Sequence, residues 1–348
     1  MTVLALDGVL DAADVALTAA AIADVQRPDG SIPWFTGGHL DPWDHVQAAM
    51  GLAVGGRHDD AAAAYRWSRD TQRPDGTWAA KYVDGQVVDA RADANFTAYI
   101  ATGVWHQWLS TGDTAFLAEL WPTVRRALDA VVSMQRPDGS VAWQRSDDGT
   151  LSPESLVTGA ASVHLSLRCG LALATVVGDD VEWAAPAARL RHALDRHPER
   201  FTPKTRFSMD WYYPVLGGSL PIDVAQARLD ARWHDFVVPG HGARCVDDQP
   251  WVTGGESAEL ALALDAAGRP DDARRVLADL QHLRRDDGTY WTGYQLVEEI
   301  FWPDEQTTWT GSTVLLALDA LTRTTPAHGL FRGEGLPAVT REAAPCAC

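Results

Sequence analysis

The phrase Gln26-Arg27-Pro28-Asp29-Gly30 returns as Gln72-Arg73-Pro74-Asp75-Gly76 and Gln135-Arg136-Pro137-Asp138-Gly139, and in altered form as Arg284-Arg285-Asp286-Asp287-Gly288. Each copy ends a stretch with helical periodicity, because proline cannot continue a helix and Asp-Gly favours a tight turn. An aromatic residue follows each copy within a few positions: Trp34, Trp78, Trp143, and Tyr290 with Trp291. A phrase that ends a helix about every 50 residues indicates one supersecondary unit copied around a common core.

Two kinds of helical stretch alternate along the chain. One kind is rich in Ala, Gly and Leu on most faces, as expected of an inner helix: 43–55, 94–110, 158–177, about 210–218, 253–267 and 307–323. The other kind has Arg and Asp on one face, as expected of an outer helix: 11–26, 58–71, 114–134, 181–196, about 222–235 and 271–284. Six of each predict an all-α fold, a closed (α/α)6 toroid with inner and outer helix rings. We expect one domain over 1–323 and a loose, Pro/Gly/Ala-rich tail over 324–348.

Composition and charge exclude several classes of partner. The 348 residues have a formal net charge of −18, which repels phosphate backbones and anionic membranes, so no nucleic acid partner is expected. No apolar run approaches the ~20 residues of a membrane span, and the first residues lack the features of a signal peptide, so a cytoplasmic location is expected. The four cysteines match neither a disulfide framework nor a zinc site: Cys169, Cys245, Cys346 and Cys348. No metal or cofactor is expected, and the oligomeric state is left open.

Acidic residues are found near the predicted starts of the inner helices, which should all lie at one end of the toroid. They include Asp41, Asp44, Asp93, Glu154, Asp210, Glu256, Glu299 and Glu305. Aspartate at such a position can serve as a helix cap, but glutamate is a poor cap, so Glu154 and Glu305 are less easily explained in that way. The chain also has 15 tryptophans, whose flat rings suit stacking on sugars or prenyl chains. Carboxylates and aromatic rings at one end are what glycosidic chemistry requires.

A longer match resembles the six-hairpin glycosidases, especially the glucoamylase family. It consists of Trp108-Leu109-Ser110-Thr111-Gly112-Asp113, then Phe116-Leu117, Trp121-Pro122-Thr123-Val124-Arg125-Arg126-Ala127-Leu128 and the third copy of the repeated phrase. In that family a Trp-x-Arg-Asp segment opens an inner helix and binds the terminal sugar. Pro42-Trp43-Asp44 resembles this segment without the arginine.

The resemblance also implies catalytic roles. The acid of that family is a glutamate before the third inner helix, where this chain has Glu154, and the base is a late glutamate, matched by Glu305, with Glu299 as an alternative. An inverting hydrolysis is implied, with the two carboxyl groups ~6.5–9.5 Å apart. The substrate would be a small molecule, an oligosaccharide or a glycoconjugate. Residues at the same end of the toroid are expected to bind it: Trp43, Asp44, Asp93, Asp210, Trp211, Tyr213, Trp251, Glu256 and Trp291.

Other functions remain open from the sequence. Gln-x-x-Asp-Gly-x-x-Trp phrases also resemble the repeats of terpene cyclases and prenyltransferase β-subunits, although the chain lacks the Asp-x-Asp-Asp and Asp-Asp-x-x-Asp segments of the cyclases. A sugar epimerase or lyase could use a histidine such as His39 or His45 as a proton shuttle. A toroid that binds sugar without catalysis is a further alternative.

Overall fold

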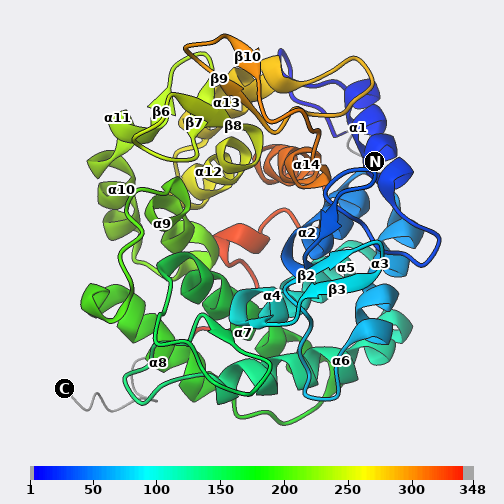
Figure 1. Ribbon diagram of the computed structural model, residues 1–348, viewed down its shortest axis with the longest axis vertical. Coiled ribbons are helices and arrows are strands. Elements are labelled where there is room, and N and C mark those ends of the chain that lie inside the picture. Colours follow the sequence, from blue (N-terminus) through cyan, green and yellow to red (C-terminus); the bar gives the residue numbers. More distant parts are fainter. Residues whose placement is uncertain (1–3, 340–348) are drawn as a thin grey trace.

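The computed structural model describes residues 4–339 and shows one ring of helices enclosed by another (Figure 1). The inner ring consists of α2 (Pro42–Val54), α4 (Ala94–Ala98) with α5 (Ile100–Thr111), α7 (Val157–Val177), α9 (Ser208–Tyr212) with η2 (Tyr213–Gly218), α12 (Gly254–Ala266) and α14 (Thr308–Thr322). The outer ring consists of α1 (Ala12–Val25), α3 (His58–Thr71), α6 (Thr114–Ser133), α8 (Ala184–Arg196), α10 (Ile222–Ala231) with α11 (Trp233–Phe236), and α13 (Pro270–Asp279) with η3 (Leu280–Leu283). The predicted all-α toroid is confirmed.

The inner helices pack in a closed cycle. α2 contacts α5, α5 contacts α7, α7 contacts η2, η2 contacts α12, α12 contacts α14, and α14 returns to α2. α1 packs against α14, so the first outer helix pairs with the last inner helix, as the sequence predicted. The cycle places α14 between α2 and α12, an arrangement that matters for the site.

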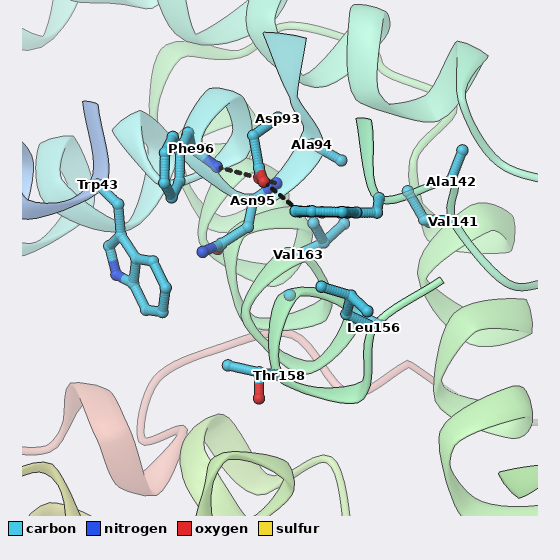
Figure 2. A pocket seen from close by; sticks show the side chains of 13 residues that line it. Trp43, Asp93, Ala94, Asn95, Phe96, Val141, Ala142, Leu156, Thr158 and Val163 are labelled. Atoms are coloured by element: carbon cyan, nitrogen blue, oxygen red, sulfur yellow. Dashed lines mark hydrogen bonds between the residues drawn. The ribbon is translucent and has the colours of Figure 1, made fainter. Parts of the chain in front are cut away.

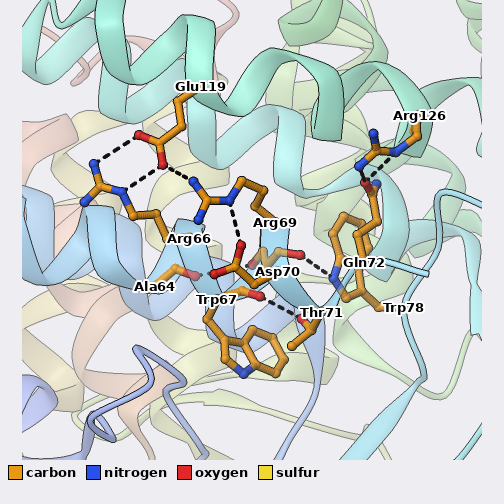
Figure 3. A network of polar contacts seen from close by, with 11 residues as sticks. Ala64, Arg66, Trp67, Arg69, Asp70, Thr71, Gln72, Trp78, Glu119 and Arg126 are labelled. Carbon is orange, nitrogen blue, oxygen red and sulfur yellow. Dashed lines mark hydrogen bonds and ion pairs between the residues drawn. The ribbon is translucent and has the colours of Figure 1, made fainter. Parts of the chain in front are cut away.

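The glutamine of each intact phrase joins its own turn to the next outer helix. Gln26 donates from Nε2 to the carbonyl of Gly30 at 3.0 Å and to that of Asp60 in α3 at 2.9 Å. The other two glutamines make the same pair of bonds, Gln72 to Gly76 and Thr123 of α6, and Gln135 to Gly139 and Pro186 of α8. Figure 3 shows Gln72 between α3 and α6, with the Arg126 guanidinium donating to its amide oxygen. The phrase is therefore scaffold rather than part of a site.

The glycine of each phrase lies against the backbone of an outer helix. Gly30, Gly76, Gly139 and Gly288 all have φ between 84° and 91°, a region that favours glycine. A Cβ at Gly76 would lie 2.3 Å from the carbonyl oxygen of Arg126 in α6. In the altered fourth copy, a Cβ at Gly288 would lie 2.5 Å from the backbone of Leu17 in α1, so this copy fixes the closure of the ring.

Short strands, which the sequence did not predict, fill the loops that lead into the inner helices. A three-stranded sheet contains β1 (His39–Leu40), β2 (Lys81–Val83) and β3 (Gln86–Asp89), and a pair contains β4 (Ala92–Asp93) and β5 (Gln144–Arg145). An antiparallel sheet of order β10-β9-β8-β7-β6 contains β6 (Val237–Val238), β7 (Gly242–Arg244), β8 (Trp251–Thr253), β9 (Gly293–Gln295) and β10 (Ile300–Phe301). We call this end of the toroid, where the inner helices begin, the mouth.

The segment after α14 packs against the opposite end of the inner ring. The expectation of a loose tail is wrong for residues 324–339, because Leu330, Phe331 and Leu336 are buried and η4 (Leu330–Arg332) packs on η2 and α12. Arg332 forms an ion pair with Asp265 near the end of α12. In Figure 1 this segment, in red, lies within the ring. Cys346 and Cys348 are outside the described residues.

α7 is long and apolar enough to cross a membrane by length and composition alone. Within the fold, however, 78% of its most apolar window is buried, and Val163, Leu165 and Leu167 belong to the main hydrophobic core. α7 therefore has the burial of a core helix.

Candidate active site

Two carboxylates hold the same position in two inner helices at the mouth. Asp41 caps α2 by accepting a hydrogen bond from the backbone N of Asp44, and Pro42 occupies the first turn, so Asp44 is the third residue of α2. Glu256 is the third residue of α12, which Thr253 precedes. Asp44 and Glu256 are 8% and 7% exposed, so each is largely buried without being sealed from solvent.

A hydrogen bond one turn deeper fixes how α2 and α12 approach each other. Gln47 of α2 donates from Nε2 to Oε1 of Glu259 in α12 at 3.2 Å. Asp44 and Glu256 each lie three residues before these partners, and residues three apart share a helix face. The charges of both glutamates also act on Asp44. Asp44 and Glu256 therefore face the same space, one turn nearer the mouth.

The surroundings of Asp44 favour the protonated form of its carboxyl group. Burial raises the pKa of Asp44 well above its usual range, and the negative charges of Asp41, Glu259 and Glu256 raise it further. Burial raises the pKa of Asp41 as well. Its carboxylate accepts from the backbone N of Asp44 at 3.0 Å and from Nε1 of Trp34 at 2.7 Å, bonds that oppose this shift by favouring the charged form. The raised pKa makes Asp44 a candidate proton donor.

Glu256 has a carboxylate oxygen available for a ligand. Among the described residues, its buried Oε2 has no hydrogen-bond partner. The Cys245 thiol lies beside it, and burial together with the charge of Glu256 raises the pKa of that thiol. An unpartnered carboxylate oxygen is costly to bury, and a water or sugar hydroxyl at this point would satisfy it.

Glu259 was not identified from the sequence. It is 1% exposed and accepts hydrogen bonds from the Tyr212 hydroxyl at 2.6 Å and from Gln47. Burial raises the pKa of Glu259 to about 7. The available signal was the spacing Glu256-x-x-Glu259 on a helix otherwise rich in Ala and Leu, which places two carboxylates on one face.

Asp93 is a helix cap that also positions a tryptophan. Its Oδ1 accepts from the backbone N of Asn95 and of Phe96, and its Oδ2 accepts from Nε1 of Trp143 at 2.7 Å. Burial raises the pKa of Asp93 to about 6. Asp41 and Trp34 make the same arrangement at α2, which explains why an aromatic residue follows these two copies of the repeated phrase.

A cavity of about 190 Å³ lies between the start of α2 and the start of α7. Trp43, Asp93, Asn95, Trp143 and Thr158 are among its lining residues, and Figure 2 shows the side chains of Trp43, Asp93, Asn95 and Thr158 around it. We call it the Trp43 cavity. The Trp43 ring meets the rings of Tyr99 and Tyr213 edge-on, at centroid distances of 5.9 and 5.5 Å. The predicted substrate-binding residues Trp43 and Asp93 therefore line one cavity, and Tyr213 supports Trp43.

The other predicted substrate-binding residues lie in three places. Asp210 is buried and accepts from Oγ1 of Thr158 at 2.7 Å. Trp211 is directed to the outer ring, where it stacks on Phe236 and donates to the carbonyl of Arg228. Trp251 and Trp291 lie on the five-stranded sheet at the mouth. Trp251 donates to the carbonyl of Trp302 at 2.9 Å, and Trp291 stacks on Phe301 at a centroid distance of 5.3 Å.

Trp251 also lines a larger hollow on the sheet. Its volume is about 570 Å³, and Arg206, Phe207, Trp251, Glu298, Ile300 and Trp302 are among its walls. We call it the sheet groove. Because β8 leads directly into α12, the groove lies at the mouth, on the side of Glu256.

The three glutamates expected to be catalytic are more exposed than Asp44 and Glu256. The Glu154 side chain is 37% exposed and forms a 3.7 Å ion pair with Lys204. Glu305 is half-buried, and burial raises its pKa, although its Oε1 accepts a 3.3 Å hydrogen bond from the Thr292 hydroxyl. Glu299 is exposed, with φ of 55°, between β9 and β10. No hydrogen bond or ion pair joins any two of the three within residues 4–339.

His45, a candidate proton shuttle, has a structural role in the fold. Its Nδ1 accepts from the backbone N of Ile32, and its Nε2 is 3.0 Å from the carbonyl of Ala64. Burial lowers the pKa of His45 to about 4. Both ring nitrogens are therefore already used between α2 and α3.

Comparisons with known proteins agree with a glycosidase. No family model matches the chain. Over 342 residues the chain is 53% identical to the MMP endo-(1,4)-3-O-methyl-alpha-D-mannosidase of Mycolicibacterium hassiacum, an alignment that covers 98% of this chain and 95% of that protein.

Solved structures of low identity share the fold. A glycosidase matches with a TM-score of 0.67 at 16% identity, over 92% of this chain and 97% of that one. A GH63 mannosylglycerate hydrolase of Thermus thermophilus, in complex with glucose, matches with a TM-score of 0.66 at 15% identity, over 87% of this chain and 99% of that one. A D-mannose isomerase matches with a TM-score of 0.65 at 12% identity, over 89% of this chain and 96% of that one. The six-hairpin glycosidase resemblance is confirmed, whereas the cyclase resemblance gains no support from these matches.

Proposed function

The chain belongs to the family of the MMP endo-(1,4)-3-O-methyl-alpha-D-mannosidase of Mycolicibacterium hassiacum, and from this membership we propose that it hydrolyses internal α-1,4 linkages in chains of 3-O-methylmannose. Membership at 53% identity over nearly the whole chain makes the protein a glycoside hydrolase. The linkage, the methylated sugar and the internal cut come from the activity named for the relative, and they form part of the proposal.

The facing pair Asp44 and Glu256 is the observation that most favours hydrolysis at this mouth. In an inverting glycosidase an acid protonates the leaving oxygen while a base on the other side of the sugar activates water. Asp44, whose pKa is raised well above its usual range, suits the acid. Glu256, with an unpartnered oxygen, suits the base. The two side chains come from helices that both pack on α14, and the proposal requires a sugar and a water between them.

The proposed step balances in atoms and charge. The bond between the anomeric carbon and the glycosidic oxygen breaks, and that oxygen takes the proton of Asp44. Water attacks the anomeric carbon from the opposite face and gives a proton to Glu256. Asp44 ends as the carboxylate and Glu256 as the acid, and exchange with solvent restores both. The negative charges of Asp41 and Glu259 favour the return of the proton to Asp44.

The two hollows at the mouth support an internal cut. In the proposed binding mode, a chain bound at the sheet groove continues past Asp44 and Glu256 to the Trp43 cavity, whose wall includes Trp43, the residue before Asp44. Sugar units on both sides of the cut would then be bound, as an endo-acting enzyme requires. The aromatic walls of both hollows suit the flat, apolar faces of sugar rings.

A second assignment follows the resemblance to glucoamylases. It uses Glu154 as acid and Glu305 or Glu299 as base. Its support is the position of Glu154 before α7 and of Glu305 before α14. The Glu154 side chain is 37% exposed and forms a 3.7 Å ion pair with Lys204, so its setting differs from that of the buried Asp44 and Glu256.

Proton NMR of the reaction on 3-O-methylated α-1,4-mannooligosaccharides tests the proposal. We expect cleavage within the chain, with the β-anomer of the new reducing end appearing first and the α-anomer growing later by mutarotation. An α-anomer formed first would overturn the inverting mechanism. Release of single sugars from one end would overturn the internal cut.

A further inference from the structure

The Trp43 cavity has an apolar wall on the side of α7. Leu156, Ala160 and Val163 line it there, and Val141 and Ala142 line it from the loop after the third repeated phrase. Its volume of about 190 Å³ is several times the ~30 Å³ share of one water molecule. The cavity is therefore large enough to hold much of a sugar unit, and most of the surface it offers is hydrocarbon.

Most polar groups of the cavity are already engaged. The carboxylate of Asp93 is used by the α4 cap and by Trp143, and the Thr158 hydroxyl donates to Asp210. Asn95 differs, because it is 4% exposed and its Oδ1 has no hydrogen-bond partner among the described residues. Figure 2 shows the Asn95 side chain between Trp43 and Asp93. A buried amide oxygen without a partner costs free energy unless a ligand hydroxyl satisfies it.

Gly159 keeps the cavity open at the start of α7. It lies in the first turn of that helix, where glycine is less stable than alanine. Its φ is not in the left-handed region, so the backbone does not require glycine. A Cβ at Gly159 would meet only the Cβ of Asn95, at 3.6 Å, which is an ordinary contact. Packing therefore does not exclude a side chain at position 159. Because glycine has none, the cavity keeps free space at this point.

We propose that the Trp43 cavity binds one methylated sugar unit of the substrate, with its 3-O-methyl group against the wall formed by Leu156, Ala160 and Val163 and with a neighbouring hydroxyl donating to Asn95. The cavity then selects methylated over unmethylated chains. This inference rests on the proposed function for its substrate class. A methyl ether gains from burial against hydrocarbon, whereas a free 3-hydroxyl in the same place would lose its hydrogen bonds to water.

Filling the cavity tests the inference. The wild type, Gly159→Ala and Gly159→Leu are compared on matched α-1,4-mannooligosaccharides with and without 3-O-methyl groups. One methyl group in an apolar pocket changes kcat/KM by roughly 10-fold or more, so we expect the wild type to prefer the methylated chain by at least that factor. Gly159→Leu should remove most of this preference, and Gly159→Ala part of it. Ala115→Leu, at an exposed position in the first turn of α6, is the matched control and should keep the preference of the wild type.

Equal kcat/KM for the two substrates in the wild type would overturn the inference, as would an equal loss on both substrates in Gly159→Leu. Thermal unfolding shows whether each variant is folded, and Gly159→Ala should be at least as stable as the wild type. Calorimetric binding of methyl 3-O-methyl-α-mannoside and methyl α-mannoside separates this inference from the proposed function. If neither chain is cleaved but the methylated sugar still binds more tightly, and Gly159→Leu abolishes the difference, the proposed function fails and the cavity assignment stands.

Discussion

Gln47 of α2 and Glu259 of α12 are 212 positions apart in sequence, yet they share a 3.2 Å hydrogen bond inside the ring. This bond holds the second turns of two non-adjacent inner helices in register. One turn nearer the mouth, the same register sets Asp44 opposite Glu256. The proposed acid and base are therefore positioned by a contact that neither of them makes.

Asp44→Asn and Glu256→Gln should each lower kcat by roughly 10²–10⁴-fold, the usual contribution of general acid–base catalysis. Both changes keep the size of the side chain, so the melting temperature should stay near that of the wild type. Initial rates on methylated mannooligosaccharides measure the effect. Glu154→Gln and Glu305→Gln are the matched controls and should retain most of the activity. A large loss in these two, with Asp44→Asn still active, would move the catalytic pair to the glutamates indicated by the glucoamylase resemblance.

Glu259→Gln should remove part of the pH dependence of stability. Burial raises the pKa of Glu259 from 4.5 to about 7, so the folded protein holds this proton more tightly than the unfolded chain. The contribution of Glu259 is fully present below pH 4.5 and is lost as the pH rises through about 7. The loss above pH 7 is on the order of 3 kcal/mol. Glutamine stays neutral and can still accept from Tyr212, so it avoids this loss.

Urea unfolding of the wild type and Glu259→Gln at pH 5 and pH 8 measures this difference. From pH 5 to pH 8 the unfolding free energy of Glu259→Gln should rise relative to that of the wild type. An unchanged difference in unfolding free energy would show that Glu259 does not titrate in this window.

Gly76→Ala should destabilise the fold more than Gly149→Ala. The two glycines have nearly equal φ, 85° and 87°, so alanine suffers similar backbone strain at both. At Gly76 the new Cβ also overlaps the carbonyl oxygen of Arg126, whereas at Gly149 nothing lies within 4 Å. The overlap should cost a further 1–3 kcal/mol, roughly. Urea unfolding measures both variants, and equal losses would contradict the close packing of the repeated phrase against α6.

Trp302→Ala should weaken the binding of long substrates. Trp302 is 51% exposed at the edge of the sheet groove. Loss of ring stacking worth about 0.5–1.5 kcal/mol should raise KM roughly 2- to 10-fold on chains long enough to reach the groove. KM on the shortest cleaved chain should stay constant, and Trp302→Phe should restore most of the binding. A uniform change in KM at every chain length would exclude the groove as part of the substrate path.

Much of the fold could be predicted from the sequence, because the repeated phrase and the two helix compositions are local signals. The strands could not be predicted, since segments of two to four residues such as β1 and β4 are too short for an alternating pattern. The inner helix expected at about 210–218 was only partly predicted. Pro214 and Gly217 interrupt it there, so α9 has five residues. The packing of residues 324–339 depends on contacts with the ends of distant helices.

The residues proposed here for the site lie at the end of the toroid where the sequence placed its candidates, since helix starts are visible in the sequence. Asp44 and Glu256 were named there as substrate-binding residues. Their mutual position could not be foreseen, because it depends on α14 lying between α2 and α12. Glu259 was missed because it lies one turn inside a helix rather than at its start. The raised pKa of Asp44 arises from burial and from three neighbouring carboxylates, a property of the assembled ring.

Leu330, Phe331 and Arg332 pack against the far ends of the inner helices. They cover that end of the described toroid, so the ring is not open at both ends. A polymer cannot be threaded through it and held while successive bonds are cut. Substrate must therefore enter at the mouth, and both fragments must leave there. We therefore expect the enzyme to let go after each cleavage, so that early digests contain a broad ladder of fragments instead of a few short products.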